Sequence, residues 1–446
     1  MTVPEIVHRV QERGRQLTYK RRPPYVKAPP LQATAPVLLR PLLLSLAGIT
    51  GALEYWEASA DRLLRGQVQL LGQTWVADPL PDWRLDPVTG RRWPDTYAFE
   101  IDYRHAAHDL GEVKYVWELN RLLYLLPVAA SAAQRQDSEL LALVRRHVED
   151  WLSQNPPYRG VAWASGIEVA LRIVALVTVD EVGQALQPDA PFSGRVWQGV
   201  AEHADWLERF PSRFSSANNH RVAELVGLLI ASLKGAHAGR AGLVENLVAE
   251  LSEVAERQYY PDGVGAEQST SYATSTMEWL GLASCALSAA GQPPASELQQ
   301  LIERAQFALD VFTDAAGNVV RVGDDDETRI LTAAVPHDRY LDAVRLLTSG
   351  RSSPAKAVVG LTVLEHGGYS VARHHEAGTE ALWVLDHGPL GFGEIAAHGH
   401  ADTLSVWLHL GGAPVFVDAG TYLYHSGDAW REYLSLIHIS EPTRPH

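Results

Sequence analysis

Three short polar segments carry residue types that could act in catalysis, and the first is SSANNHR at 215–221. Asn219 and His220 fall in the first turn of the apolar helix that this segment introduces. Backbone N–H groups and the positive end of a helix dipole favour an anion at that place. Residues that only cap the helix explain the same pattern, so this segment by itself leaves an anion site and a plain cap both open.

The second segment is ERQYYPDGVGAEQSTSYATS at 256–275, in which a PDG turn leads into a Ser/Thr-rich helix start. Tyr272 is expected in the first turn of that helix. A phenol placed there acts as a general acid or base if it meets the reacting atom. A tyrosine that only packs on its neighbours at the rim is the alternative.

The third segment, 396–424, holds two histidines and an aspartate. His398 and His400 are two residues apart, which places both on one face if the segment is a strand. Gly411-Gly412 predicts a two-residue hairpin turn that would set Ser405 opposite Asp418. Imidazole and carboxylate suit zinc, but a structural zinc site needs four ligands. A polar strand end with no ligand remains the alternative.

Two further charged groups are interpreted as structural. Glu168 and Arg172 are four residues apart on an expected helix and are predicted to pair with each other. The run GDDDE at 323–327 could bind a cation, but it is interpreted as a solvated acidic turn.

The elements that must position these residues change character along the chain. Residues 1–35 are basic and predict an arm or a short helix followed by an extended linker. Apolar residues at three- and four-residue spacing then predict eight helices joined by short loops, which would form antiparallel hairpins; they cover 115–133, 138–154, 162–184, 194–208, 219–234, 240–258, 269–290 and 296–312. After about residue 350, short alternating segments such as LSVWLHL predict an antiparallel β domain.

Composition excludes several classes of protein. The chain has 446 residues and a net charge of -15, which argues against non-specific nucleic-acid binding. Its single cysteine, Cys285, excludes an intramolecular disulfide and a cysteine zinc cluster. The longest apolar run, 36–48, is interrupted and too short to span a membrane. No signal peptide is visible, so a periplasmic and a cytoplasmic location both stay open, and we expect no organic cofactor.

Taken together, the motifs resemble those of the heparinase II/III-like polysaccharide lyases, a group that includes related alginate lyases. The resemblance covers roughly 80–433 and depends on these strings: WPDTYAFEIDYRHAAHDLGEVKYVWELNR (93–121), NNHR (218–221), the DG…EQS…Y run (262–272), HGHAD (398–402) and VDAGTY (417–422). It implies an α+β multidomain chain, with an (α/α) toroid before an antiparallel β-sandwich.

The resemblance also suggests domain limits. An N-terminal arm and linker is expected at 1–80, the toroid at 81–349, and a partial sandwich at 356–433. The LSLIHISEPTR part of 434–446 resembles a translated sequencing adapter, so we expect this tail to be an artefact.

The reaction that the resemblance implies is β-elimination at a uronic acid, with an acidic polysaccharide or oligosaccharide as substrate. Asn219 and His220 match positions that contact the substrate carboxylate, Tyr272 matches the acid or base, and His398 matches a histidine at the reacting centre. His400 and Asp418 match two ligands of a structural zinc whose third ligand lies beyond this chain. The expected substrate-binding residues are Arg221, Glu224, Gln268, Tyr422 and Arg431.

Two other functions stay open at this point. A glycoside hydrolase on the same toroid would need two separated carboxylates; Glu224, Glu267 and Asp402 are available, but no pair among them stands out. A non-catalytic glycan-binding or exopolysaccharide assembly protein is the second. Ultraviolet absorbance of the products distinguishes elimination from hydrolysis, because only elimination leaves a conjugated double bond.

Overall fold

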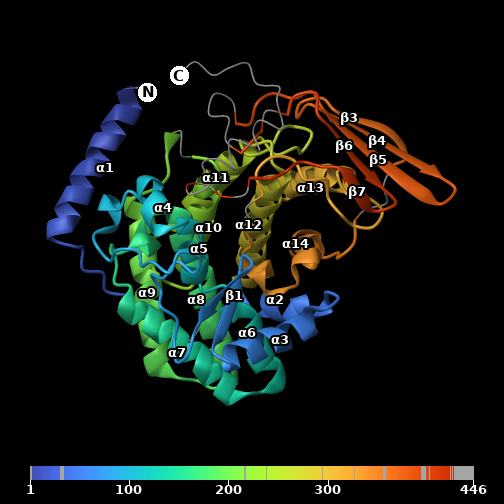
Figure 1. Ribbon diagram of the computed structural model, residues 1–446. Coiled ribbons are helices and arrows are strands. Elements are labelled where there is room, and N and C mark those ends of the chain that lie inside the picture. The colour runs from blue at the N-terminus through green and yellow to red at the C-terminus, as the bar shows by residue number, and fades with distance from the viewer. Residues whose placement is uncertain are drawn as a thin grey trace. The chain divides into compact units, whose positions relative to one another are not determined.

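The computed structural model (Figure 1) describes residues 3–30, 35–214, 217–237, 239–293, 295–325, 327–354, 358–392, 398–400, 402–421, 423 and 425. The chain forms two compact units. The first unit comprises Met1–Val248, Ala289–Gly291 and Leu331–Pro336. The second unit comprises Ala249–Ser288, Gln292–Ile330 and His337–His446.

The first unit is a helical assembly with one short hairpin. Its helices and strands are α1 (Val3–Arg21), α2 (Arg40–Ser45), α3 (Ala52–Leu64), β1 (Gln67–Leu70), β2 (Gln73–Val76), α4 (Tyr103–Leu110), α5 (Val113–Asn120), α6 (Leu125–Arg135), α7 (Ser138–Gln154), α8 (Gly166–Leu186), α9 (Ala190–Arg209) and α10 (Asn219–Leu233). Helix α8 is apolar on all sides rather than along one stripe, and it packs on α6, α9 and α10. Such a helix belongs in the centre of a core.

The second unit places a helical layer against one face of a sheet. Helix α11 (Leu243–Glu256) begins in the first unit and ends in the second, which also holds α12 (Thr270–Ala289), α13 (Ser296–Val311) and α14 (Tyr340–Ser349). The strands are β3 (Gly360–Leu364), β4 (Tyr369–Glu376), β5 (Thr379–Asp386), β6 (Val406–Leu410) and β7 (Ala413–Phe416). They form an antiparallel meander in chain order. One face of the sheet, including Tyr369, Leu382 and Trp407, packs on Phe312 and Val322 to form a core.

The helix-rich region followed by an antiparallel sheet confirms the fold class expected from the sequence. One helix range needs correction, because 115–133 is two helices, α5 and α6. Pro127 explains the break, since a proline inside a helix removes a hydrogen bond, whereas in the first turn of α6 it does not. Leu122, with φ 63°, turns the chain between the two helices. The first 35 residues also differ, because they contain a 19-residue helix, α1, rather than a short one.

The predicted strand hairpin has a different register from the expected one. Leu410 pairs with Ala413 and His409 with Pro414, but Leu408 pairs with Phe416, so the ladder slips by one residue. Val415 is the extra residue. Proline in a sheet is confined to edge strands and bulges, and Pro414 lies in the edge strand at this bulge. The expected pairing of Ser405 with Asp418 is therefore wrong.

The residues before β6 also depart from the prediction. His398 and His400 lie outside any strand, and His398 has a left-handed φ of 64°. The described residues of the β domain form one sheet. Closure of the helices into a toroid, a second sheet that completes a sandwich, and the expected domain limits stay predictions. Within the described residues, no helix combines the length and hydropathy that crossing a bilayer requires.

Buried polar groups in the first unit form pairs that helix spacing does not predict. Glu168 accepts two hydrogen bonds from Arg121, at 2.9 Å each, instead of pairing with Arg172. The Arg172 Nε donates to His203 Nε2 at 3.0 Å, and its guanidinium lies over the ring of Trp151. Because the His203 Nδ1 lies 2.7 Å from a carbonyl oxygen, which only accepts, His203 is neutral with its proton on Nδ1.

A second buried histidine makes the stability of this unit depend on pH. His147 is fully buried, and burial lowers its pKa to about 4. Its ordinary pKa of about 6.5 returns on unfolding. The unfolded chain therefore binds more protons between these values, so stability present above pH 6.5 is lost as the pH falls toward 4. At pH 5 the loss from this one group is on the order of 2 kcal/mol.

We expect the His147→Gln variant to lose less stability than the parent chain when the pH falls from 7.5 to 5. Chemical denaturation at both pH values, followed by circular dichroism, measures the difference. His105→Gln is the matched control, because His105 lies on the exposed helix α4. Equal losses in the parent and His147→Gln chains would contradict the buried neutral state of His147.

Candidate functional site

A phenol and an imidazole stack directly on each other in the second unit. Tyr272 lies in the first turn of α12, where its backbone N–H donates to the Ser269 Oγ at 3.2 Å. The ring of His398 lies 3.6 Å from the Tyr272 ring, centroid to centroid, and the planes are inclined by 15°. The structure thus brings together two of the residues predicted to act in catalysis, from segments 126 positions apart in the chain.

The carboxylate of Asp324 organises this stack from below. Its Oδ2 lies 3.0 Å from His398 Nδ1 and its Oδ1 lies 3.1 Å from His400 Nε2. The Thr421 hydroxyl donates to Oδ1 at 2.6 Å. Burial alone would raise the pKa of Asp324, but the hydrogen bonds from His398, His400 and Thr421 outweigh it and hold the pKa well below its usual range.

An ionised Asp324 fixes the protonation of His398. A carboxylate only accepts hydrogen bonds, so the His398 Nδ1 carries a proton. The His398 Nε2 lies 3.6 Å from the Glu267 Oε2. A histidine oriented in this way by a carboxylate on one nitrogen can exchange a proton or hold a negative charge through the other.

His400 and Asp418, the two predicted metal ligands, also lie together. The His400 Nδ1 is 2.8 Å from the Asp418 Oδ2, and the Asp418 side chain is 1% exposed. Burial alone would lower the pKa of His400, but the hydrogen bonds to Asp324 and Asp418 raise it to about 10. Without a metal, His400 is therefore doubly protonated between two carboxylates.

The chemistry of this pair fits part of a zinc site. One imidazole and one carboxylate meet, and Asp324 holds the other nitrogen of His400, as an outer carboxylate does for a zinc-bound histidine. The described residues contain no group of three His, Cys, Asp or Glu side chains that could hold an ion. The pair thus supplies two ligands, and a zinc site stays a prediction.

A second carboxylate pair lies beside these residues. Burial raises the pKa of Asp402 to about 7, and the charge of Asp386 raises it further in the same direction. Burial also raises the pKa of Asp386. Two adjacent buried carboxyl groups cannot both ionise easily, so the pair holds a proton near neutral pH.

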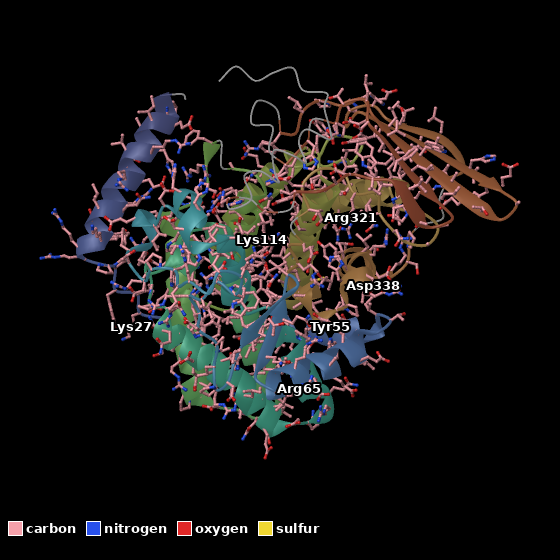
Figure 2. The ribbon with its side chains drawn as sticks, viewed as in Figure 1. Lys27, Tyr55, Arg65, Lys114, Arg321 and Asp338 are labelled. Atoms are coloured by element: carbon pink, nitrogen blue, oxygen red, sulfur yellow. The ribbon has the colours of Figure 1, made fainter. Side chains whose placement is uncertain are left out.

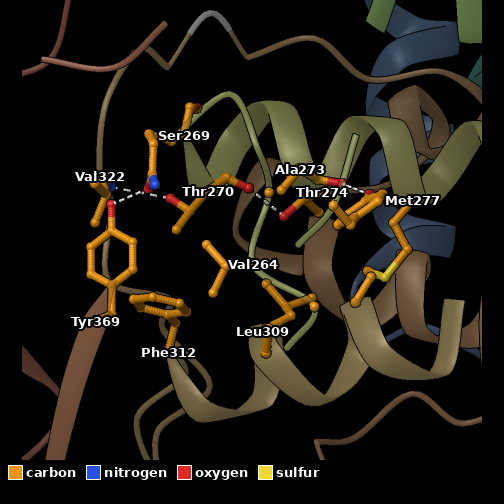
Figure 3. Close-up of a pocket in the computed structure, with 16 residues that line it drawn as sticks. Val264, Ser269, Thr270, Ala273, Thr274, Met277, Leu309, Phe312, Val322 and Tyr369 are labelled. Carbon is orange, nitrogen blue, oxygen red and sulfur yellow. Dashed lines mark hydrogen bonds between the residues drawn. The ribbon is translucent and has the colours of Figure 1, made fainter. Parts of the chain in front are cut away.

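Gln268 lies behind the site rather than at its surface. Its side-chain nitrogen donates to the Gly367 carbonyl at 3.0 Å, and its oxygen accepts from the Tyr369 hydroxyl at 2.7 Å. Gln268 lines a small apolar cavity together with Phe312 and Val322 (Figure 3). The amide thus ties α12 to the sheet, and its predicted contact with substrate stays a prediction.

The remaining predicted residues lie at the start of α10, in the first unit. Asn218 caps this helix by accepting from the His220 backbone N–H at 3.3 Å. Arg221 donates to Glu224 at 3.2 Å, and both Ser212 groups, N–H and hydroxyl, donate to Glu224 at 2.8 and 2.6 Å. Burial raises the pKa of Glu224, and Arg221 opposes the shift.

These contacts give Arg221 and Glu224 a bracing role beneath the helix start. A Cβ at Gly166 would lie 2.2 Å from the Glu224 carboxylate, so only glycine fits there. Asn219 is buried and His220 is half-buried. Convergence of this helix start with Tyr272 and His398, and the substrate contacts of Arg221 and Glu224, stay predictions.

Two predicted residues, Tyr422 and Arg431, lie outside the described residues, as does the predicted artefact tail 434–446. Sequence reasoning missed Asp324, because GDDDE was interpreted as a solvated turn, whereas Asp324 is 5% exposed. The preceding Gly323 carries the available signal. Its φ is 70°, and a Cβ there would lie 2.4 Å from the Gln268 carbonyl oxygen, so the chain turns tightly inward at this point.

Comparison with known protein families gives two matches. A model described as the heparinase II/III N-terminus matches residues 82–305, and one described as heparinase II/III-like, C-terminal, matches residues 358–436. The first covers half of the chain by itself. No curated protein matches this sequence.

Solved structures with a similar fold include one described as heparinase III, which is 18% identical to this chain with a TM-score of 0.62. That match covers 94% of this chain and 64% of heparinase III. A heparan sulfate lyase from Pedobacter heparinus is 16% identical, with a TM-score of 0.50, and the match covers 96% and 63% of the two chains. The chain thus spans less than two thirds of the length of these proteins.

Asp324 is expected to set the titration of His400. In metal-free protein, Asp324→Asn removes one of the two carboxylates that raise the pKa of His400, so that pKa should fall from about 10 toward its ordinary value. Nuclear magnetic resonance of ¹⁵N-histidine-labelled protein across a pH series measures it.

The matched control for this titration is Asp325→Asn. Asp325 is the next residue in the chain, and it pairs with the exposed Arg321, labelled in Figure 2. It should leave the His400 titration unchanged. If Asp324→Asn and Asp325→Asn give the same titration curve as the parent, the assigned role of Asp324 is wrong.

Proposed function

The chain belongs to the heparinase II/III-like family, and on that premise we propose that it is a polysaccharide lyase that cleaves a uronic-acid-containing glycan by β-elimination. The observation that carries the proposal is the stack of Tyr272 on His398, with Asp324 holding the far nitrogen of that imidazole. An acid–base phenol and an oriented imidazole at one place suit a reaction that moves protons on a sugar ring.

The proposed reaction removes the C5 proton of the uronate. The C5–H electron pair forms the C4=C5 double bond, the C4–O bond breaks, and the departing oxygen takes a proton. The two products are a sugar with a free hydroxyl and an unsaturated uronate, and no water is added. Removing a proton beside a carboxylate builds a dianionic enolate, so the site must supply donors to that charge.

We assign roles to residues on this basis. Tyr272 transfers the protons at C5 and at the departing oxygen, as base, acid or both. His398, with its Nδ1 proton held by Asp324, presents Nε2 to the reacting ring. Asn219 and His220 donate to the uronate carboxylate, where the N-terminus of α10 adds its positive dipole.

Zinc is proposed as a structural ion held by His400 and Asp418, with further ligands outside the described residues. When bound, it would replace the proton that these two side chains now share and would fix the segment that carries His398. The site needs no zinc for its acid and base, because Tyr272 and His398 supply both.

The hydrolase alternative receives less support. A hydrolase needs an acid and a base on opposite sides of the bond, several ångströms apart. The one carboxyl group whose pKa is raised to about 7 is Asp402, and it shares its proton with the adjacent Asp386. Such a coupled pair does not provide separated acid and base groups.

We expect the chain to release products with the ultraviolet absorbance of unsaturated uronates from at least one of three polymer types: heparan-sulfate-like, alginate-like or capsule-type. Tyr272→Phe should lower that rate by more than about 10³-fold, because it removes the proton-transfer group. Asn219→Ala should lower it by about 10²–10³-fold through loss of a donor to the enolate. Absorbance recorded during digestion measures both effects.

Tyr55→Phe is the matched control, since Tyr55 lies on α3 (Figure 2), away from any residue assigned here. Chain cleavage without new absorbance would favour the hydrolase. Polymer binding without cleavage would favour a non-catalytic glycan-binding or exopolysaccharide assembly protein. Full activity of Tyr272→Phe would remove the central role from the phenol.

Zinc content should depend on His400 and Asp418. We expect His400→Ala and Asp418→Asn to lose bound zinc after purification with added zinc and removal of the excess, as measured by elemental analysis. Asp314→Asn provides a control, because Asp314 and His409 form a similar buried pair, 2.9 Å apart, elsewhere in the same unit. Stoichiometric zinc in Asp418→Asn, or none in the parent chain, would contradict the assignment.

A further inference from the structure

Helix α1 is attached to the first unit through its polar face. Tyr19 packs on the rings of Tyr158 and Phe210, at 5.9 and 6.0 Å between centroids, and its hydroxyl accepts from Arg209. On the same face the Gln16 carbonyl accepts from the Tyr97 hydroxyl at 2.7 Å. These contacts fix which side of α1 faces the protein.

The ring of His8 continues this contact toward the start of the helix, where it lies 5.6 Å from the Phe214 ring. Glu5, which is 8% exposed, lies on the same side. The face of α1 that packs on the protein is therefore built from aromatic and polar side chains.

The opposite face of α1 carries an aliphatic stripe in solvent. Ile6, Val10 and Leu17 are 47%, 67% and 54% exposed. Their spacing of four and seven residues places them in one line, and 1.5 Å of rise per residue makes that line about 16 Å long. An amphipathic helix normally buries its apolar face, so α1 is attached the opposite way round.

Cationic side chains flank the stripe. Arg9, Arg13, Lys20 and Arg21 are exposed, and helical geometry places them beside the aliphatic line, three or four residues from its members. Residues 1–27 contain seven Lys and Arg against two Glu, a net charge of +5, whereas the whole chain carries -15. The stripe is therefore the apolar centre of a basic surface on an acidic protein.

This combination selects the chemistry of the partner. A second copy of α1 would place the same cations against each other, which is unfavourable. A stable protein interface also buries about 800 Å² on each side, more than three side chains on one convex helix provide. A lipid surface with anionic headgroups meets both features, because it accepts aliphatic side chains at shallow depth and cations at its headgroups.

We propose that α1 is a membrane-surface helix that binds anionic lipid headgroups through its cations and inserts Ile6, Val10 and Leu17 shallowly among the acyl chains. Such binding is peripheral and salt-sensitive, because its electrostatic part is screened by ions. The contacts of Tyr19 and Gln16 leave this face turned outward while the helix remains on the protein. This inference does not depend on the proposed lyase activity.

Vesicle sedimentation tests the proposal with two lipid compositions. The parent chain should sediment with phosphatidylcholine vesicles that contain phosphatidylglycerol, and not with pure phosphatidylcholine, and high salt should release it. The triple variant Ile6→Ser, Val10→Ser, Leu17→Ser should lower the bound fraction at least about tenfold, and so should Arg13→Glu with Arg21→Glu. Circular dichroism verifies that each variant keeps its helix content.

Matched controls place the same changes elsewhere on the first unit. Leu64→Ser, Val76→Ser, Val88→Ser alters three side chains that are also exposed, and Arg65→Glu with Arg146→Glu reverses two exposed charges, the first of them labelled in Figure 2. Both controls should bind vesicles as the parent does. If a control lowers binding as much as its α1 counterpart, the effect is not specific to α1 and the proposal fails.

Three further results would overturn the proposal. The first is absence of vesicle binding by the parent chain at low salt. The second is binding to a heparin column that the charge reversals abolish, together with vesicle binding that the serine variant retains, because this pattern belongs to a glycan surface. The third is a dimer of the parent chain in light scattering that the serine variant converts to a monomer.

Discussion

The carboxylate of Asp324 is the interaction on which the arrangement of the candidate site depends. A buried carboxylate is costly unless several donors meet it. Here His398, His400 and Thr421 all do, from residues 74 to 97 positions further along the chain. The backbone of Asp324 adds two more contacts, since its N–H donates to the His398 carbonyl and its carbonyl accepts from the Ser269 hydroxyl. The start of α12, the acidic turn and the histidine segment are held together by this one residue.

Close packing around Gly323 enforces the same arrangement. Any side chain at that position would collide with the carbonyl oxygens of Gln268 and His398. The backbone of three segments therefore approaches within hydrogen-bonding distance, and the left-handed φ of His398 turns its ring onto Tyr272. Strain of this kind persists only where the surrounding contacts determine the conformation. The site is thus held rigidly by backbone contacts as well as by charge.

Much of the fold follows from local sequence signals. Helices such as α7, α10 and α13 begin where apolar periodicity and capping residues predict them, because those signals lie within one or two turns. The break at Pro127 was also readable from the sequence. The β-bulge at Val415 and the pairing of Glu168 with Arg121 were not, because each depends on a partner that local spacing does not reveal. Motifs identified Tyr272, His398, His400 and Asp418, but nothing local distinguished Asp324 from its acidic neighbours.

The bulge in the β6–β7 hairpin makes Asp418 unusually sensitive to chain length. Side chains alternate between the two faces of a strand, so removing Val415 would straighten the ladder and turn Asp418 away from His400. Losing two residues would preserve the facing and only shorten the reach. Homologous hairpins that keep a histidine partner for this aspartate should therefore differ in length by even numbers of residues.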